Sequence, residues 1–229
     1  DRMYEESYDK LVLSPGAAPI VPTLSGVDLP CVFTLRNLPD MDRIKAFVDE
    51  KQPARAVVVG GGFIGLEIAE NLQHRGVQVT LIELLNQVMA PIDPEMAALI
   101  HQHLIFKKIR LALGDGLKSI AKGEDGWLEV GLTSGRQVDS QMVILSIGVR
   151  PESALAEDAG LELGVRGTIK TDEHMQTSDP DIYAVGDAVE VTHRITGKPA
   201  HLALAGPASR QGRIVADHIT GRRVNFKGV

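Results

Sequence analysis

The sequence is poor in the residues that build disulfide and metal sites. Cys31 is the only cysteine among 229 residues, so the chain cannot form an internal disulfide and has no CxxC pair for zinc or dithiol chemistry. The seven histidines are scattered. The two nearest, His101 and His103, lie two positions apart in a predicted helix, where their side chains diverge. We therefore expect no metal site.

Long apolar runs and an excess of positive charge are also missing. No segment has the apolar length of a membrane-spanning helix, and the polar stretch 1–10 lacks the order of a secretory signal. The net charge is -6, so nucleic acids and anionic membranes would be repelled at long range. A hydrophobic content of 44% is enough for a sizeable core. We expect a globular cytoplasmic protein that binds small molecules, with no nucleic-acid or membrane partner.

Apolar runs that alternate with glycine breaks predict an α/β fold. The continuous apolar run 56–59 is typical of a strand buried on both faces of a parallel sheet. Asn37 and Pro39 are typical of a helix start. Several short strands between 110 and 146 predict a meander laid against the sheet. Strands are expected at 11–13, 56–59, 77–82, 110–113, 117–121, 127–132, 142–146 and 182–185, and helices at 38–50, 63–75, 94–108, 153–159 and 206–219.

A glycine-rich segment follows the strand at 56–59. Gly60, Gly62 and Gly65 match the GxGxxG pattern, with Gly61, Phe63 and Ile64 between them. The first glycine allows a tight turn, the second lets a pyrophosphate approach the backbone, and the third lets the helix pack closely on the strand. The helix start then offers free amides and partial positive charge to the phosphates. The strand before and the helix after favour a dinucleotide site over a turn that is glycine-rich only for geometric reasons.

An acidic residue stands where the dinucleotide pattern requires one. Glu83 ends the next predicted strand, about 20 residues past the loop. Its carboxylate can accept hydrogen bonds from the adenosine ribose hydroxyls and would repel a 2′-phosphate. Residues 84–87 include no lysine or arginine. The pattern therefore predicts NAD, with NADH preferred over NADPH, and the alternative is that Glu83 only caps a turn.

Three segments together resemble the flavoprotein pyridine nucleotide-disulfide oxidoreductases. They are 57–67, 145–151 with Gly148, and 177–187 ending in Gly186 and Asp187, and the crossover 13–17 adds to them. The resemblance implies FAD as a second cofactor. It also implies a Rossmann-like NAD-binding domain, with a parallel sheet plus β-meander, inserted in a partial FAD-binding domain of related fold. The expected boundaries are 1–36 and 151–229 for the FAD-binding parts and 37–150 for the NAD-binding domain.

The resemblance also implies roles for single residues. Asp187 would hydrogen-bond the flavin ribitol, although a strand-end turn is the plain alternative. Glu67 would lie near the nicotinamide and Ile64 would hold its ring, while position alone allows Glu67 to be an ordinary surface glutamate. The stretch 204–213 is similar to coenzyme A disulfide reductases and NADH-dependent persulfide reductases. In that subgroup it approaches the flavin and the thiol substrate, and Ser209 is the substrate contact implied here.

The chain departs from the family at both ends. It lacks the first FAD-binding strand, its GxGxxG loop and the helix with the redox cysteine, and it lacks the C-terminal interface domain. Cys31 has no flanking features of a redox cysteine, so we name no catalytic residue. We expect a fragment that binds pyridine nucleotide and is inactive alone.

The intact enzyme would be a homodimer that passes hydride from NADH to FAD and on to a disulfide or persulfide such as a coenzyme A derivative. Two alternatives stay open. One is an NADH oxidase, peroxidase or ferredoxin-reductase type of flavoenzyme, and the other is a nucleotide-binding module without catalysis.

Overall fold

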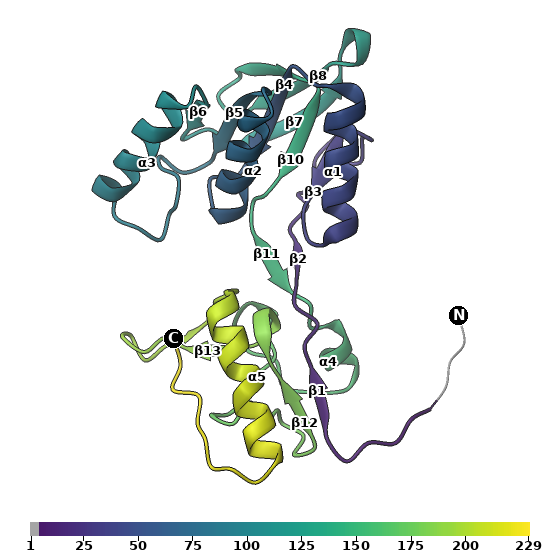
Figure 1. Cartoon of the computed structure of the whole chain (residues 1–229), viewed down its shortest axis with the longest axis vertical. Coiled ribbons are helices and arrows are strands. Elements are labelled where there is room, and N and C mark those ends of the chain that lie inside the picture. The colour runs from purple at the N-terminus through teal and green to yellow at the C-terminus, as the bar shows by residue number, and fades with distance from the viewer. Residues whose placement is uncertain (1–4) are drawn as a thin grey trace. The chain divides into compact units, whose positions relative to one another are not determined.

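The computed structural model describes residues 5–229, and the chain forms two compact units (Figure 1). Unit 1 contains the residues up to 18 and those from 149 onward, and unit 2 contains residues 19–148. The chain therefore leaves unit 1 early, completes unit 2 and returns.

A parallel five-stranded sheet forms the centre of unit 2. Its strand order is β3 (Val32–Thr34), β10 (Met142–Leu145), β4 (Arg55–Val59), β5 (Gln78–Glu83) and β6 (Arg110–Leu113). Every neighbouring pair is parallel. Because β4 and β10 lie inside the sheet and both their faces are covered, they read as continuous apolar runs.

Each face of this sheet packs against a different layer (Figure 1). Helices α1 (Leu38–Lys51), α2 (Phe63–His74) and α3 (Pro94–Phe106) contribute to the core cluster that contains Ala56 and Val58. The antiparallel meander of β7 (Leu117–Lys122), β8 (Leu128–Leu132) and β9 (Gln137–Ser140) packs against Val57 and Val59. Alternate residues of one strand thus serve two cores.

The start of α1 has the cap that the sequence predicts. The Asn37 side chain accepts a hydrogen bond from the Asp40 amide, and the Asp40 carboxylate accepts one from the Asn37 amide. This reciprocal pair satisfies two amides that a helix start leaves without intrahelical partners. Pro39 lies in the first turn, as expected.

Unit 1 is built on a short parallel pair. Strands β1 (Leu11–Leu13) and β12 (Ile182–Ala184) lie side by side, and α4 (Ala154–Asp158) and α5 (Ala205–Ile219) belong to the same unit. The final segment has no regular structure, but Phe226 is buried in this core. Smaller strands form two pairs: β2 (Ala17–Pro19) with β11 (Val149–Pro151), and β13 (Val191–Thr192) with β14 (Pro199–Ala200).

The predicted α/β fold with a parallel sheet and a meander is confirmed. The sequence patterns missed β2, β3, β9, β11, β13 and β14. Strand β3 pairs with β10, and residues 19–36 belong to unit 2. Across residues 5–229, no helix is both long enough and apolar enough to cross a bilayer.

Candidate functional site

The glycine-rich loop joins β4 to α2 at the carboxyl edge of the parallel sheet. Gly60 has φ +108°, and its amide donates to the Ile82 carbonyl at 2.8 Å. A Cβ on Gly60 would lie 2.2 Å from the Ser146 carbonyl oxygen. Both the backbone conformation and the close approach of the neighbouring chain therefore require glycine.

The other two glycines of the pattern differ in their surroundings. A Cβ on Gly65 would lie 1.9 Å from the Gly60 carbonyl oxygen, so α2 can pack on the loop only without a side chain there. At Gly62, no atom of the described residues beyond its own chain neighbours lies within 4 Å of the Cβ position. The backbone at Gly62 is therefore open to an approaching ligand, while the glycines on either side are enclosed.

The first turn of α2 presents free donors. Gly62 caps the helix with no side-chain hydrogen bond, and Leu66 is the first residue whose amide bonds back into the turn. Among the described residues, the amides of Phe63, Ile64 and Gly65 have no acceptor. Such a helix start, with its partial positive charge, is suited to an anion such as a phosphate.

Glu83 ends β5 and contacts this loop directly. Its Oε2 accepts a hydrogen bond from the Gly61 amide at 2.7 Å, and its Oε1 accepts one from the Leu85 amide at 2.8 Å. Each carboxylate oxygen can accept two hydrogen bonds. Glu83 therefore does cap the turn at 83–85, and it keeps acceptor capacity for a ligand. The two uses that the sequence left as alternatives are compatible.

A cavity of about 480 Å³ opens beside this carboxylate. Its wall is mostly apolar and includes Leu84 and Leu85, which are 67% and 50% exposed. Such a cavity, largely apolar with a few polar groups, suits a small organic ligand. The lining includes Gly60, Glu83, Leu85, Gly116 and Thr133.

Other predicted residues of unit 2 lie on α2 and after β10. Ile64 and Glu67 line a second, apolar groove of about 270 Å³ between α1 and α2. The Glu67 side chain is exposed, as an ordinary surface glutamate would be. Gly148 has φ +122°, and its carbonyl accepts a hydrogen bond from the Ile20 amide at 2.9 Å. Phe63, at the start of α2, is 58% exposed.

The remaining predicted residues belong to unit 1. Gly186 follows β12 with φ +84°, and its amide donates to the side chain of Gln211 on α5 at 2.8 Å. The Asp187 carbonyl contacts His201 Nε2 at 2.7 Å. Within the described part of the chain, the Asp187 carboxylate has no hydrogen-bond partner. Ser209 is exposed on α5. Gln211 is 1% exposed and supports Gly186, a role that no spacing rule predicts.

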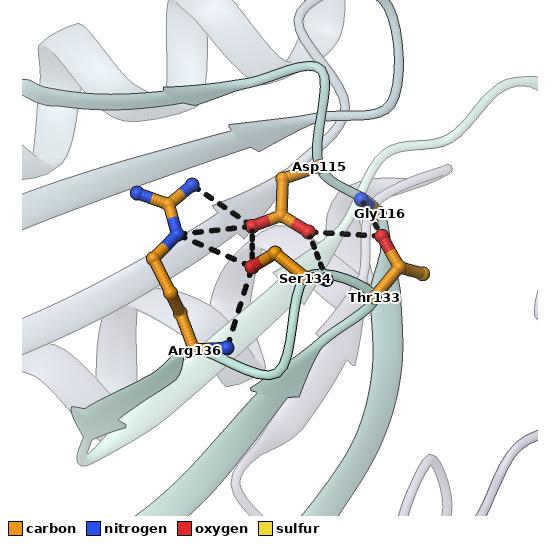
Figure 2. Close-up of polar contacts among 5 residues, drawn as sticks. All are labelled: Asp115, Gly116, Thr133, Ser134 and Arg136. Atoms are coloured by element: carbon orange, nitrogen blue, oxygen red, sulfur yellow. Dashed lines mark hydrogen bonds and ion pairs between the residues drawn. The ribbon is translucent and has the colours of Figure 1, made fainter.

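A polar cluster that sequence reasoning missed surrounds Asp115 (Figure 2). Its Oδ1 accepts hydrogen bonds from the Thr133 hydroxyl and the Ser134 amide, both at 2.9 Å. Its Oδ2 accepts from the Ser134 hydroxyl at 2.6 Å and from Arg136 Nη2 at 2.8 Å and Nε at 3.2 Å. The Ser134 hydroxyl first, then the Ser134 amide, Arg136 and Thr133, hold the pKa of Asp115 far below its usual range, against the opposing effect of burial.

The fold and loop described above are those of a known family. The family model for pyridine nucleotide-disulphide oxidoreductases matches residues 2–212, and the chain belongs to this family.

Three relatives show where the chain lies in the family. It is 36% identical to a coenzyme A disulfide reductase of Staphylococcus haemolyticus, over 98% of this chain and 50% of that protein. The structure of reduced CoADR-RHD from Bacillus anthracis is 52% identical with a TM-score of 0.94, over 99% of this chain and 40% of that one. The third is an engineered water-forming NADPH oxidase bound to NADPH, derived from the NADH oxidase of Lactobacillus brevis. It is 33% identical with a TM-score of 0.89, over 98% of this chain and 49% of that one. The chain spans about half the length of the curated relative.

Proposed function

We propose that unit 2 binds the ADP-ribose half of NADH. One arrangement carries the proposal. Amides at the start of α2 that have no acceptor in the described part of the chain, the open backbone at Gly62 and the Glu83 carboxylate converge on one loop. The amides suit the diphosphate, and the carboxylate suits the adenosine ribose hydroxyls. In this proposal Gly60 to Gly65 and Glu83 hold the nucleotide, and Ile64, Glu67 and Gly148 lie toward its nicotinamide.

The preference for NADH over NADPH rests on Glu83. A 2′-phosphate at the ribose would meet a carboxylate, with no lysine or arginine in residues 84–87 to offset the repulsion. The engineered NADPH oxidase carries a glycine-to-alanine change and, eighteen positions later, an aspartate-to-alanine change followed directly by an alanine-to-arginine change. Gly65 and Glu83 have the same separation here, and Leu84 follows Glu83. This equal separation supports Glu83 as the counterpart of the acidic position removed in that enzyme.

We propose that unit 1 contributes to binding FAD. The residues fit this use in one respect: the Asp187 carboxylate beside Gly186 has no partner in the described chain and is free to accept a hydroxyl of the flavin side chain. A bound flavin would supply the electron-transfer chemistry. The residues of this chain bind and orient the cofactors. The boundaries of the FAD-binding and NAD-binding parts stay proposals.

For the whole protein, we propose hydride transfer from NADH to FAD and then reduction of a disulfide or persulfide such as a coenzyme A derivative, with Ser209 near the substrate. The similarity to the coenzyme A disulfide reductase supports this substrate class. Burial raises the pKa of the Cys31 thiol, which disfavours the thiolate that a nucleophile needs. We therefore expect this chain alone to reduce no disulfide. A homodimer in the cytoplasm completes the proposal.

A second candidate is an NADH oxidase. The similarity to the engineered oxidase, which derives from a water-forming NADH oxidase, favours this candidate. The two candidates are separated by assaying the full-length protein with coenzyme A disulfide and with oxygen as acceptors.

Calorimetric titration of this chain with NADH, NADPH and ADP-ribose tests the nucleotide proposal. We expect binding of NADH and ADP-ribose and weaker binding of NADPH. Failure of ADP-ribose to bind would contradict the proposal, and equal affinities for NADH and NADPH would remove the role of Glu83. Flavin content after purification with added FAD tests the role of unit 1 separately.

A further inference from the structure

We propose that Asp115 is a positioning residue for nucleotide recognition, which holds the segment that carries Glu83 against the meander. This inference rests on the proposed function and adds a specificity determinant to the same site. Asp115 lies in the connection between β6 and β7, thirty-two positions after Glu83, and matches no nucleotide-binding pattern.

The backbone around Asp115 is bonded directly to the Glu83 segment. The Asp115 amide donates to the Glu83 carbonyl at 3.1 Å, and the Gly114 amide donates to the Leu85 carbonyl at 2.8 Å. The two segments also approach closely, since a Cβ on Gly114 would lie 2.5 Å from the Asn86 side-chain oxygen. A displacement of residues 114–115 would therefore displace residues 83–86.

The Asp115 side chain anchors this connection to a different layer (Figure 2). Among the residues that the structure describes, it accepts hydrogen bonds only from the turn that joins β8 to β9, through Thr133, Ser134 and Arg136. Thr133 closes the link, because its hydroxyl also accepts from the Gly116 amide at 3.0 Å. The meander turn, the β6–β7 connection and the Glu83 segment thus belong to one hydrogen-bonded network.

Two residues of this hydrogen-bonded network lie at the cavity beside Glu83. Gly116 and Thr133 line that cavity together with Glu83 and Leu85. The Asp115 carboxylate itself is 2% exposed, and the cavity lining does not include it. Asp115 therefore does not contact a ligand in the cavity. It determines how far the Glu83 carboxylate lies from Gly116 and Thr133 across the cavity.

Asp115→Asn tests the proposal, because it keeps the size of the side chain and replaces one acceptor oxygen by a donor that faces other donors. We expect ADP-ribose to bind about tenfold more weakly, the effect of one lost charge-assisted hydrogen bond at Glu83. The same substitution should change the affinity for 2′-deoxy ADP-ribose, which lacks the adenosine 2′-hydroxyl, by less than about twofold. The hydrogen bond between that hydroxyl and Glu83 is already missing in this analogue. Asp139→Asn is the matched control, since Asp139 lies on β9 of the same meander.

A general weakening of the fold would give a different result. It would lower the melting temperature and reduce the affinity for both nucleotides equally, and that outcome would overturn the proposal. The proposal is also overturned if wild type binds ADP-ribose and its 2′-deoxy analogue equally well, while nucleotide binding itself would stand. If wild type binds neither, the proposed function fails too.

A second variant keeps the proposal testable if Asp115→Asn does not fold. Arg136 is 60% exposed and lies outside the cavity lining, so Arg136→Met removes an outer partner of Asp115 at little cost to the core. We expect about a threefold loss for ADP-ribose, smaller for the 2′-deoxy analogue, and partial recovery with Arg136→Lys, which keeps one charged donor. Equal losses for the two ligands, or no loss, would overturn the proposal.

Discussion

Units 1 and 2 both place a glycine of positive φ after a parallel strand, but they hold it by different means. In unit 2, the Gly60 amide bonds to the neighbouring strand, and a Cβ would collide with the Ser146 carbonyl. In unit 1, the Gly186 amide bonds to the Gln211 side chain, and no atom of the described chain beyond the immediate neighbours of Gly186 lies within 4 Å of its Cβ position. The unit 2 loop is thus enclosed by backbone, while the unit 1 loop depends on one side chain.

The largest expected effect separates these two glycines. Gly60→Ala meets both an unfavourable φ and a backbone collision, and we expect it to lower the free energy of unfolding by about 3 kcal/mol or more. Gly186→Ala meets only the unfavourable φ, for which about 1 kcal/mol is expected. Urea unfolding of both variants measures the difference. Equal losses would show that the two loops are held alike.

Gln211 should be the weak point of the unit 1 loop. Gln211→Met keeps the apolar part of the side chain but leaves the Gly186 amide without its acceptor, at a cost of about 2 kcal/mol. Urea unfolding and flavin retention are the measurements. Gln87→Met is a suitable control, because the Gln87 side chain donates to a single acceptor within residues 5–229, the carbonyl of Ile92. No difference between the two variants would mean that Gly186 does not depend on Gln211.

The acidic residues of the two units sharpen the comparison. Glu83 bonds to the Gly61 amide, so Glu83→Gln should weaken NADH binding about tenfold, narrow the gap to NADPH and lower stability slightly. The exposed Glu50→Gln controls for the loss of one charge. Asp187→Asn should leave the free energy of unfolding unchanged, because the carboxylate has no protein partner in the described chain. Fluorescence titration of NADH and thermal melting measure these effects, and unchanged nucleotide selectivity in Glu83→Gln would contradict the prediction.

The smallest expected effect is the change with pH in the stability that Asp115 contributes, because this contribution does not vary near neutral pH. Its pKa is lower in the folded chain than the value of about 3.9 for a free aspartate. A carboxyl of lowered pKa adds stability above the unfolded pKa, and this contribution is lost as the pH falls through the folded pKa. The stability difference between wild type and Asp115→Asn should therefore be constant at neutral pH and shrink below about pH 4. A difference that grows in acid would contradict this sign.

Local signals were sufficient to predict the glycine-rich loop at 60–65. Residues 55–83 form a strand, a glycine turn, a helix and a second strand within one short stretch, and each part has its own pattern. The β3 strand was missed because three residues with no alternation carry no period, and only its partner β10 makes it a strand. The same holds for β9, whose polar sequence pairs with β8 at the edge of the meander.

The sequence by itself determined the family, the parallel sheet with its meander, and the strand, glycine turn and helix start. Each of these is predicted by patterns whose residues lie only a few positions apart. Only the tertiary structure decided that Glu83 reaches the Gly61 amide, that Gln211 supports Gly186 and that Asp115 joins the meander to the Glu83 segment. Those contacts join residues that lie 18 to 32 positions apart in the chain. At such separations no periodicity reports the partner, and the distance depends on how the layers pack.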